Sequence, residues 1–166
     1  MRFVFMFVCL VQFGHIMAKS TDVKKLRLLY CQARENKQYA VKFLKALEGN
    51  DDKSDPLILS YRGLALLFEA NFSLNPYRKF ACFNKGKALL EQAVKKDPAN
   101  AEIRFLQFCV QTNVPFFLNY NSKINEDKLL LLNCRSRIND EELKQLIKNS
   151  LIKSGYCNTE EKMKLL

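Results

Sequence analysis

The sequence predicts an all-α fold built from helical hairpins that stack on one another. The main observation is residues 83–108, FNKGKALLEQAVKKDPANAEIRFLQF, in which two segments with helical spacing of apolar residues flank a short break. Pro98 biases Asp97 away from the α region and ends the first segment, and Asn100 can cap the second through a backbone N–H. The second observation is that no segment of the chain has the convincing alternation of a β-strand.

The spacing around this break resembles the second half of a tetratricopeptide-type repeat. A small residue at Ala93 is followed five positions later by Pro98, and Asn100-Ala101-Glu102 opens the next helix. A single hairpin of this kind cannot bury its apolar face, so such repeats stack and leave a groove used for binding. The resemblance implies a TPR-like α-α superhelix of degenerate hairpins with a helical C-terminal cap.

Two helices are predicted ahead of residue 50. The first begins after Ser20 or Thr21 and carries apolar residues at helical spacing as far as Ala33. Asn36 breaks it, and the second helix covers residues 37–47 before Gly49, which is a natural residue after a helix end.

The third helix is predicted over residues 56–71, because Asp55 is a good cap and Pro56 suits a first helical position. Gly63 within it resembles the small residue that lets paired repeat helices approach closely. Residues 71–78, NFSLNPYR, then lengthen the hairpin, and we expect their apolar side chains to pack over one of its ends. The fourth and fifth helices are predicted over residues 79–96 and 101–112.

Beyond Pro115 the pattern is less repeat-like. An aromatic segment at 116–120, FFLNY, precedes a leucine-rich helix at 123–133. Asn139 with Glu142 resembles a capping box that opens a helix over 140–153, and Asn158 with Glu161 repeats that arrangement for a short final helix.

The chain opens with MRFVFMFVCLVQFGHIMAKS, which is typical of a secretory signal. Arg2 is followed by an apolar run and by a small residue at Ala18. The run is shorter than the roughly 20 residues that a membrane span needs, although an uncleaved anchor or a buried first helix stays an alternative. We therefore expect a signal peptide at 1–18 and one TPR-like helical domain at 19–166, exported to the periplasm or the cell envelope.

Composition argues against an enzyme. The chain has 27 Lys and Arg against 17 Asp and Glu, a net charge of +10, and its one histidine, His15, lies in the expected signal. The mature protein would then lack the commonest general base and metal ligand. No phosphate-binding loop or nucleophile motif is present, and adjacent acidic residues on a helix point about 100° apart. We predict no catalytic residue, cofactor or metal site; a carboxylate-based enzyme is the remaining alternative.

Five cysteines follow the expected signal, and none of them has C-x-x-C spacing. Each sits in or beside an apolar helical pattern, where a free thiol behaves as a small hydrophobe. We expect free buried thiols, with one or two disulfides as the alternative that an exported location allows. The five are Cys31, Cys82, Cys109, Cys134 and Cys157.

The residues after the expected signal resemble a family of uncharacterised exported, tetratricopeptide-like proteins of Bacteroidetes-type bacteria. The likeness rests on NPYRKFACFNKGKALLEQAVKKDPANAEIRFLQFCVQTNVPFFLNY and extends loosely through NEDK and the Tyr156-Cys157 tail. The resemblance implies an all-helical fold and an exported location. It implies no activity and no functional residue.

Three surfaces are candidates for binding. The basic stripe, Arg78, Lys85 and Lys96, aligns on one side of the fourth helix. A polar stripe on the fifth helix, Arg104, Gln107 and Gln111, is expected to line the groove, with Lys85 and Tyr120 beside it. The aromatic segment at 116–120 can anchor a partner, but we expect it to plug the end of the solenoid. Each of these stripes can also be an ordinary solvated or internally paired face.

Two functions follow from these surfaces. The first is a non-enzymatic scaffold or adaptor that binds a protein or peptide through its helical groove. The alternative is a protein whose basic stripe holds it to anionic lipid or lipopolysaccharide. Export makes nucleic acid the least expected partner.

Overall fold

The computed structural model describes residues 22–34, 36–48 and 55–165, and within these ranges the chain is all-helical without a strand. The all-α prediction is thereby confirmed. The expected signal at 1–18 lies outside the described residues. The α-helices are α1 (Val23–Ala33), α2 (Lys37–Leu47), α3 (Pro56–Phe72), α4 (Pro76–Lys96), α5 (Ala101–Asn113), α6 (Ile124–Cys134), α7 (Glu141–Lys153) and α8 (Thr159–Met163). Two short 3-10 turns, η1 (Phe116–Leu118) and η2 (Arg135–Arg137), precede and follow α6.

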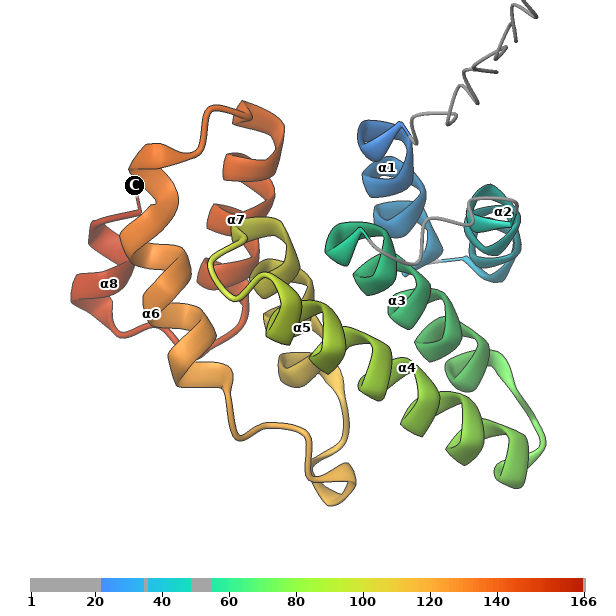
Figure 1. Ribbon diagram of the computed structural model, residues 1–166. Coiled ribbons are helices and arrows are strands. Elements are labelled where there is room, and N and C mark those ends of the chain that lie inside the picture. Colours follow the sequence, from blue (N-terminus) through green and yellow to red (C-terminus); the bar gives the residue numbers. More distant parts are fainter. Residues whose placement is uncertain (1–21, 35, 49–54, 166) are drawn as a thin grey trace, which may run out of the picture.

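Successive helices pack as hairpins, α1 with α2, α3 with α4 and α5 with α6. In Figure 1 the N-terminal helices α1–α3 lie on one side and α6–α8 on the other, with α5 between them and α4 running alongside α3. α5 is the central element, because it contacts α3, α4, α6 and α7. All residues from Glu102 to Cys109 are buried, as expected for a helix that is apolar on two sides.

Side-chain caps fix several helix starts where the sequence predicted them. Asp55 accepts hydrogen bonds from the N–H groups of Leu57 and Ile58, with Pro56 as the first helical residue. Asn100 accepts from the backbone of α5 in the same way, and Asn158 forms a full capping box with Glu161. The start of α7 differs by one residue from the prediction, since Asp140 caps that helix.

Two glycines allow α3 and α4 to touch backbone to backbone. A Cβ atom on Gly86 would lie 2.7 Å from the carbonyl oxygen of Gly63, and a Cβ on Gly63 would lie 2.8 Å from that of Gly86. Real Cβ contacts are longer than this, so a side chain at either position would push the helices apart. About two turns beyond Gly86 along α4, buried Ala93 packs with Leu59 and Ile103 where α3, α4 and α5 meet.

The connection between α3 and α4 is shorter than the sequence predicted. Asn75 caps α4 and Pro76 is its first helical residue, so the helix begins three residues before Lys79. The expectation that the apolar residues of this segment pack over the end of the hairpin is wrong for Leu74 and Tyr77. Leu74 lies in the short link between the two helices and is exposed, and Tyr77 is exposed on the first turn of α4. Phe72, the last residue of α3, is partly buried and packs against the core.

None of the five cysteines in the described ranges forms a disulfide. Cys109, Cys134 and Cys157 are buried, and burial raises the pKa of each of these thiols above its ordinary value. The part of the chain that the structure describes contains no helix with the length and apolar character needed to cross a membrane.

Candidate functional site

The polar stripe of α5 is not an open groove face. Its three residues are almost fully buried, with exposed fractions of 4% for Arg104, 3% for Gln107 and 2% for Gln111. α6 folds back and packs along this side of α5, so the stripe lies between the two helices of a hairpin. The expectation that these side chains face a groove is therefore wrong, and in this structure they cannot contact a partner directly.

The stripe is satisfied by acidic residues at the start of α6. Arg104 forms ion pairs with Asp127, at 2.8 Å from Nε to Oδ1, and with Glu126, at 2.6 Å. The Gln111 amide donates to Asp127 at 3.3 Å, and its oxygen accepts from the Lys123 N–H at 3.0 Å. With its amide nitrogen turned toward α6, Gln107 donates to both oxygens of Asp127. These contacts fasten α6 to α5.

Asp127 is the most deeply buried acid of this group, with no exposed surface. Burial raises its pKa to about 7 by penalising the charged carboxylate, although the positive charge of Arg104 acts in the opposite direction. The neighbouring Glu126 has the opposite shift. Hydrogen bonds from Lys123 and Arg104 hold the pKa of Glu126 below its usual value.

Tyr120, which the sequence suggested as an aromatic anchor, is also buried. Its hydroxyl lies 3.3 Å from the Gln107 amide, and its ring meets Phe83 edge-on with centroids 6.4 Å apart. The Lys87 ammonium sits 4.9 Å from the centroid of the same ring. Tyr120 thus joins the segment after α5 to α4 and presents no ring to a partner.

A second buried ionic centre, which we did not predict from the sequence, ties the two halves of the protein together. Arg27 of α1 binds both carboxylate oxygens of Glu102 at 2.9 and 3.0 Å, and the Tyr61 hydroxyl donates to Glu102 at 2.5 Å. Arg27 also reaches Asp140, the cap of α7, at 3.0 Å. Burial acts to lower the pKa of Arg27, but the hydrogen bonds and the negative charge of Glu102, together with the hydrogen bond to Asp140, raise it overall. The centre joins α1, α3, α5 and α7.

The basic stripe lies on the exposed side of α4. Arg78, Lys85 and Lys96 are all exposed, and Arg78 forms an ion pair with Glu69 of α3. The three positions are spread along nearly the whole helix, about 27 Å at 1.5 Å per residue. Arg78 and Lys85 therefore belong to the first part of α4, while Lys96 belongs to its other end.

Exposed apolar side chains gather at the start of α4 and in η1. We call this set the aromatic end, and it consists of Leu74, Tyr77, Phe80, Phe116 and Phe117. Phe116 and Phe117 are each 83% exposed, so the expectation that the 116–120 segment plugs the solenoid holds only for its second half. Leu118 and Tyr120 pack with Phe83 against α4, and this contact turns the two phenylalanines outward.

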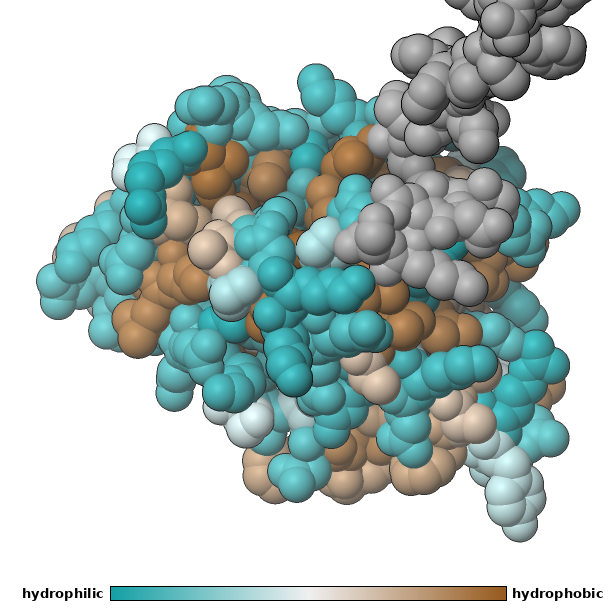
Figure 2. All heavy atoms as spheres, in the orientation of Figure 1, coloured by the Kyte–Doolittle hydropathy of each residue, from teal (hydrophilic) through white to brown (hydrophobic). Residues whose placement is uncertain are grey.

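The two segments of the aromatic end lie on the same side of the molecule. In Figure 1, η1 and the start of α4 both project from the lower side, and Figure 2 shows moderately hydrophobic side chains along that edge. Residues 70–90 contain four basic residues and no acidic one, and residues 113–123 contain Lys123 and no acidic one. The aromatic end thus combines exposed apolar side chains with basic residues nearby in the same two segments.

The described residues contain no group of three or more His, Cys, Asp or Glu side chains placed to hold a metal ion. The buried carboxylates Glu102 and Asp127 are each occupied by an arginine and by neutral donors. Comparison of the chain with protein-family models, with curated proteins and with solved structures found no match.

Proposed function

We propose that this chain is an exported, non-enzymatic, TPR-like binding module that associates with an anionic lipid surface through its aromatic end. The observation that carries the proposal is the five exposed apolar side chains of the aromatic end, set among basic residues in segments without acidic ones. The TPR-like reading is supported by the glycine contact between α3 and α4 and by the position of Ala93 between three helices.

Exposed aromatic rings with adjacent lysine and arginine suit the boundary between membrane and water. Aromatic side chains enter the headgroup level, and each basic residue near an anionic surface contributes about 1 kcal/mol of attraction. Phe116, Phe117 and Tyr77 would supply the insertion, and Lys79 and Lys85 the electrostatic attraction. The two contributions add, so neither alone has to be strong.

A protein or peptide partner at the same aromatic end is the second candidate function. Exposed aromatic residues are the usual anchors of protein interfaces, and this is the observation in its favour. A peptide in a groove along α5 has less support, because the polar stripe that would have contacted it is buried under α6.

Vesicle sedimentation tests the proposal. The chain without residues 1–18 should bind phosphatidylglycerol vesicles and release them as salt rises, and phosphatidylcholine vesicles should bind at least about tenfold more weakly. Phe116→Ser with Phe117→Ser should weaken binding to the anionic vesicles by about tenfold or more. Leu28→Ser with Val41→Ser is the matched control, because both residues are exposed but lie on α1 and α2.

Two results would overturn the lipid assignment. One is equal binding to both kinds of vesicle, and the other is an equal loss in the control variant. A third result would favour the protein partner. The chain would then bind no vesicle, but it would retain an envelope protein that the Phe116→Ser, Phe117→Ser variant does not retain. Export is tested separately, by determining whether protein secreted from a bacterial host begins near residue 19.

A further inference from the structure

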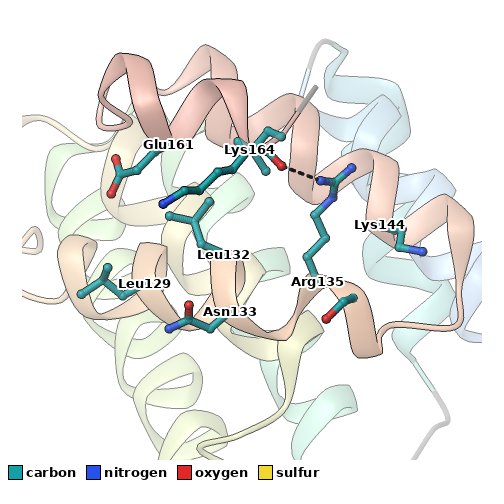
Figure 3. A pocket seen from close by; sticks show the side chains of 9 residues that line it. Leu129, Leu132, Asn133, Arg135, Lys144, Glu161 and Lys164 are labelled. Atoms are coloured by element: carbon teal, nitrogen blue, oxygen red, sulfur yellow. Dashed lines mark hydrogen bonds between the residues drawn. The ribbon is translucent and has the colours of Figure 1, made fainter.

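A pocket of about 460 Å³ lies between α6, η2, α7 and α8, away from the aromatic end. Figure 3 shows α6 and η2 forming one side of it, with the Arg135 guanidinium at the backbone oxygen of Lys164 and the Lys164 side chain extending away from Arg135 over Leu132. Leu129, Leu132 and Leu165 also line it. The volume is within the range of small-molecule sites, and the lining combines an apolar wall with positively charged side chains.

Arg135 is the side chain at this pocket that is best placed to bind an anion. Its Nη1 donates to the backbone oxygen of Lys164 at 3.3 Å, which is a neutral acceptor (Figure 3). Its Nε is buried and has no hydrogen-bond partner among the described residues, and none of their carboxylates lies within ion-pair distance of its guanidinium. A guanidinium with an open donor at a pocket wall is suited to a carboxylate, which it can bind with two parallel hydrogen bonds.

The other charges around the pocket leave it positive. Lys164 crosses the pocket in Figure 3, and its ammonium is 3.1 Å from Glu160 in a pair exposed on both sides, which is easily exchanged for another anion. Glu161 is already bound to Lys128 at 2.8 Å and to the Asn158 N–H at 2.9 Å. The one acidic residue of the wall, Glu161, is therefore paired with a lysine, whereas no carboxylate of the described residues pairs with Arg135.

We propose that this pocket binds a carboxylate that carries a short apolar chain. The carboxylate would pair with Arg135, with Lys164 turning from Glu160 to assist, and the chain would lie on Leu129 and Leu132. Leu129 is half exposed at the pocket wall, so a ligand there would remove apolar surface from water. The proposal is independent of membrane association, since it uses helices at the other side of the molecule.

Calorimetry with octanoate tests this site. We expect octanoate to bind at least about tenfold more tightly than inorganic phosphate, which lacks the chain, and than octanol, which lacks the charge. Arg135→Met should weaken octanoate binding by about tenfold or more. Arg137→Met is the matched control, because Arg137 is exposed two residues away on the same turn and does not line the pocket.

A second variant keeps the test informative if Arg135→Met fails to fold. Leu129→Asp changes an exposed residue and should weaken octanoate binding while leaving the circular dichroism spectrum unchanged. Phe117→Ser should leave octanoate binding unchanged. The proposal is overturned if octanoate does not bind, if octanol binds equally well, or if Arg137→Met weakens binding as much as Arg135→Met.

Discussion

The polar side of α5 and the aromatic end differ in which side chains they bury. The polar side of α5 buries charged and amide groups, whereas the aromatic end exposes apolar rings. On α5, Arg104, Gln107 and Gln111 are enclosed by α6 and matched by Asp127. At the aromatic end, the rings of Phe116 and Phe117 are exposed to water. A buried polar group is costly unless it is hydrogen-bonded, so the α5 side is built for stability. Exposed aromatic rings add nothing to folding, so the aromatic end is available for binding.

The comparison predicts that substitutions in the two regions separate stability from binding. The largest effect is expected for Glu102→Ala, which removes the carboxylate from Arg27 and Tyr61. Removing one partner of a buried ion pair costs about 3–5 kcal/mol. Asp140 still contacts Arg27 in this variant, but the buried Tyr61 hydroxyl also loses its acceptor, so the free energy of unfolding from urea denaturation should fall by about that amount. Glu91→Ala is the control, because Glu91 is exposed and only 3.9 Å from Lys87 on its own helix. Equal losses in the two variants would contradict the structural role of Glu102.

Arg104→Ala should be the next most damaging change. It deprives Asp127 of its positive partner and leaves the contact between α5 and α6 with neutral donors only. We expect the free energy of unfolding to fall by about 3 kcal/mol at pH 8. The loss should be smaller at pH 5, where Asp127 is protonated and does not need a counter-charge. Weaker vesicle binding at unchanged thermal stability would instead support a direct binding role for Arg104.

The pH dependence of stability should identify Asp127. Its pKa is about 7 in the folded protein and near 3.8 when unfolded, so the folded chain holds this proton more tightly. The resulting stabilisation is complete below pH 4 and is lost as the pH rises through 7. The stability of the parent relative to Asp127→Asn should therefore fall by about 2 kcal/mol between pH 5 and pH 7. A difference that does not change with pH would mean that Arg104 keeps Asp127 charged throughout.

The smallest effect on stability is expected at the aromatic end. Phe117→Ser should change the free energy of unfolding by less than about 0.5 kcal/mol, because an exposed side chain loses little packing. Phe83→Ser is the contrasting variant, since this ring is buried against Tyr120 and its loss should cost about 3 kcal/mol or more. A large loss in Phe117→Ser would show that η1 contributes to the core.

Local patterns predicted the helices well, because their causes are local. Asp55, Asn100 and Asn158 cap helices through side chains that reach N–H groups two or three residues away. The misplaced start of α4 had a local signal too, since Asn75 followed by Pro76 has the same cap-and-proline pattern as Asp55 and Pro56. The missed pattern would have predicted that Tyr77 also lies on this helix.

The burial of the candidate site residues could not be predicted from the sequence pattern of a single helix. Arg104, Gln107 and Gln111 share a face of α5, and helical spacing alone predicted that relation. Whether that face meets water or another helix depends on residues 12 to 23 positions away, namely Lys123, Glu126 and Asp127 around the start of α6. The partner of Arg27 is 75 positions distant, so no spacing rule could have paired it with Glu102.

By itself the sequence determined the helical class, most of the helix boundaries and the close approach at Gly63, because these depend on backbone preferences and on the size of single residues. The tertiary structure alone decided which polar stripe became a buried ionic centre and which aromatic residues remained exposed. The physical reason is that a polar side chain can be buried only where hydrogen-bond or ion-pair partners meet it, and these partners come from helices distant in the chain.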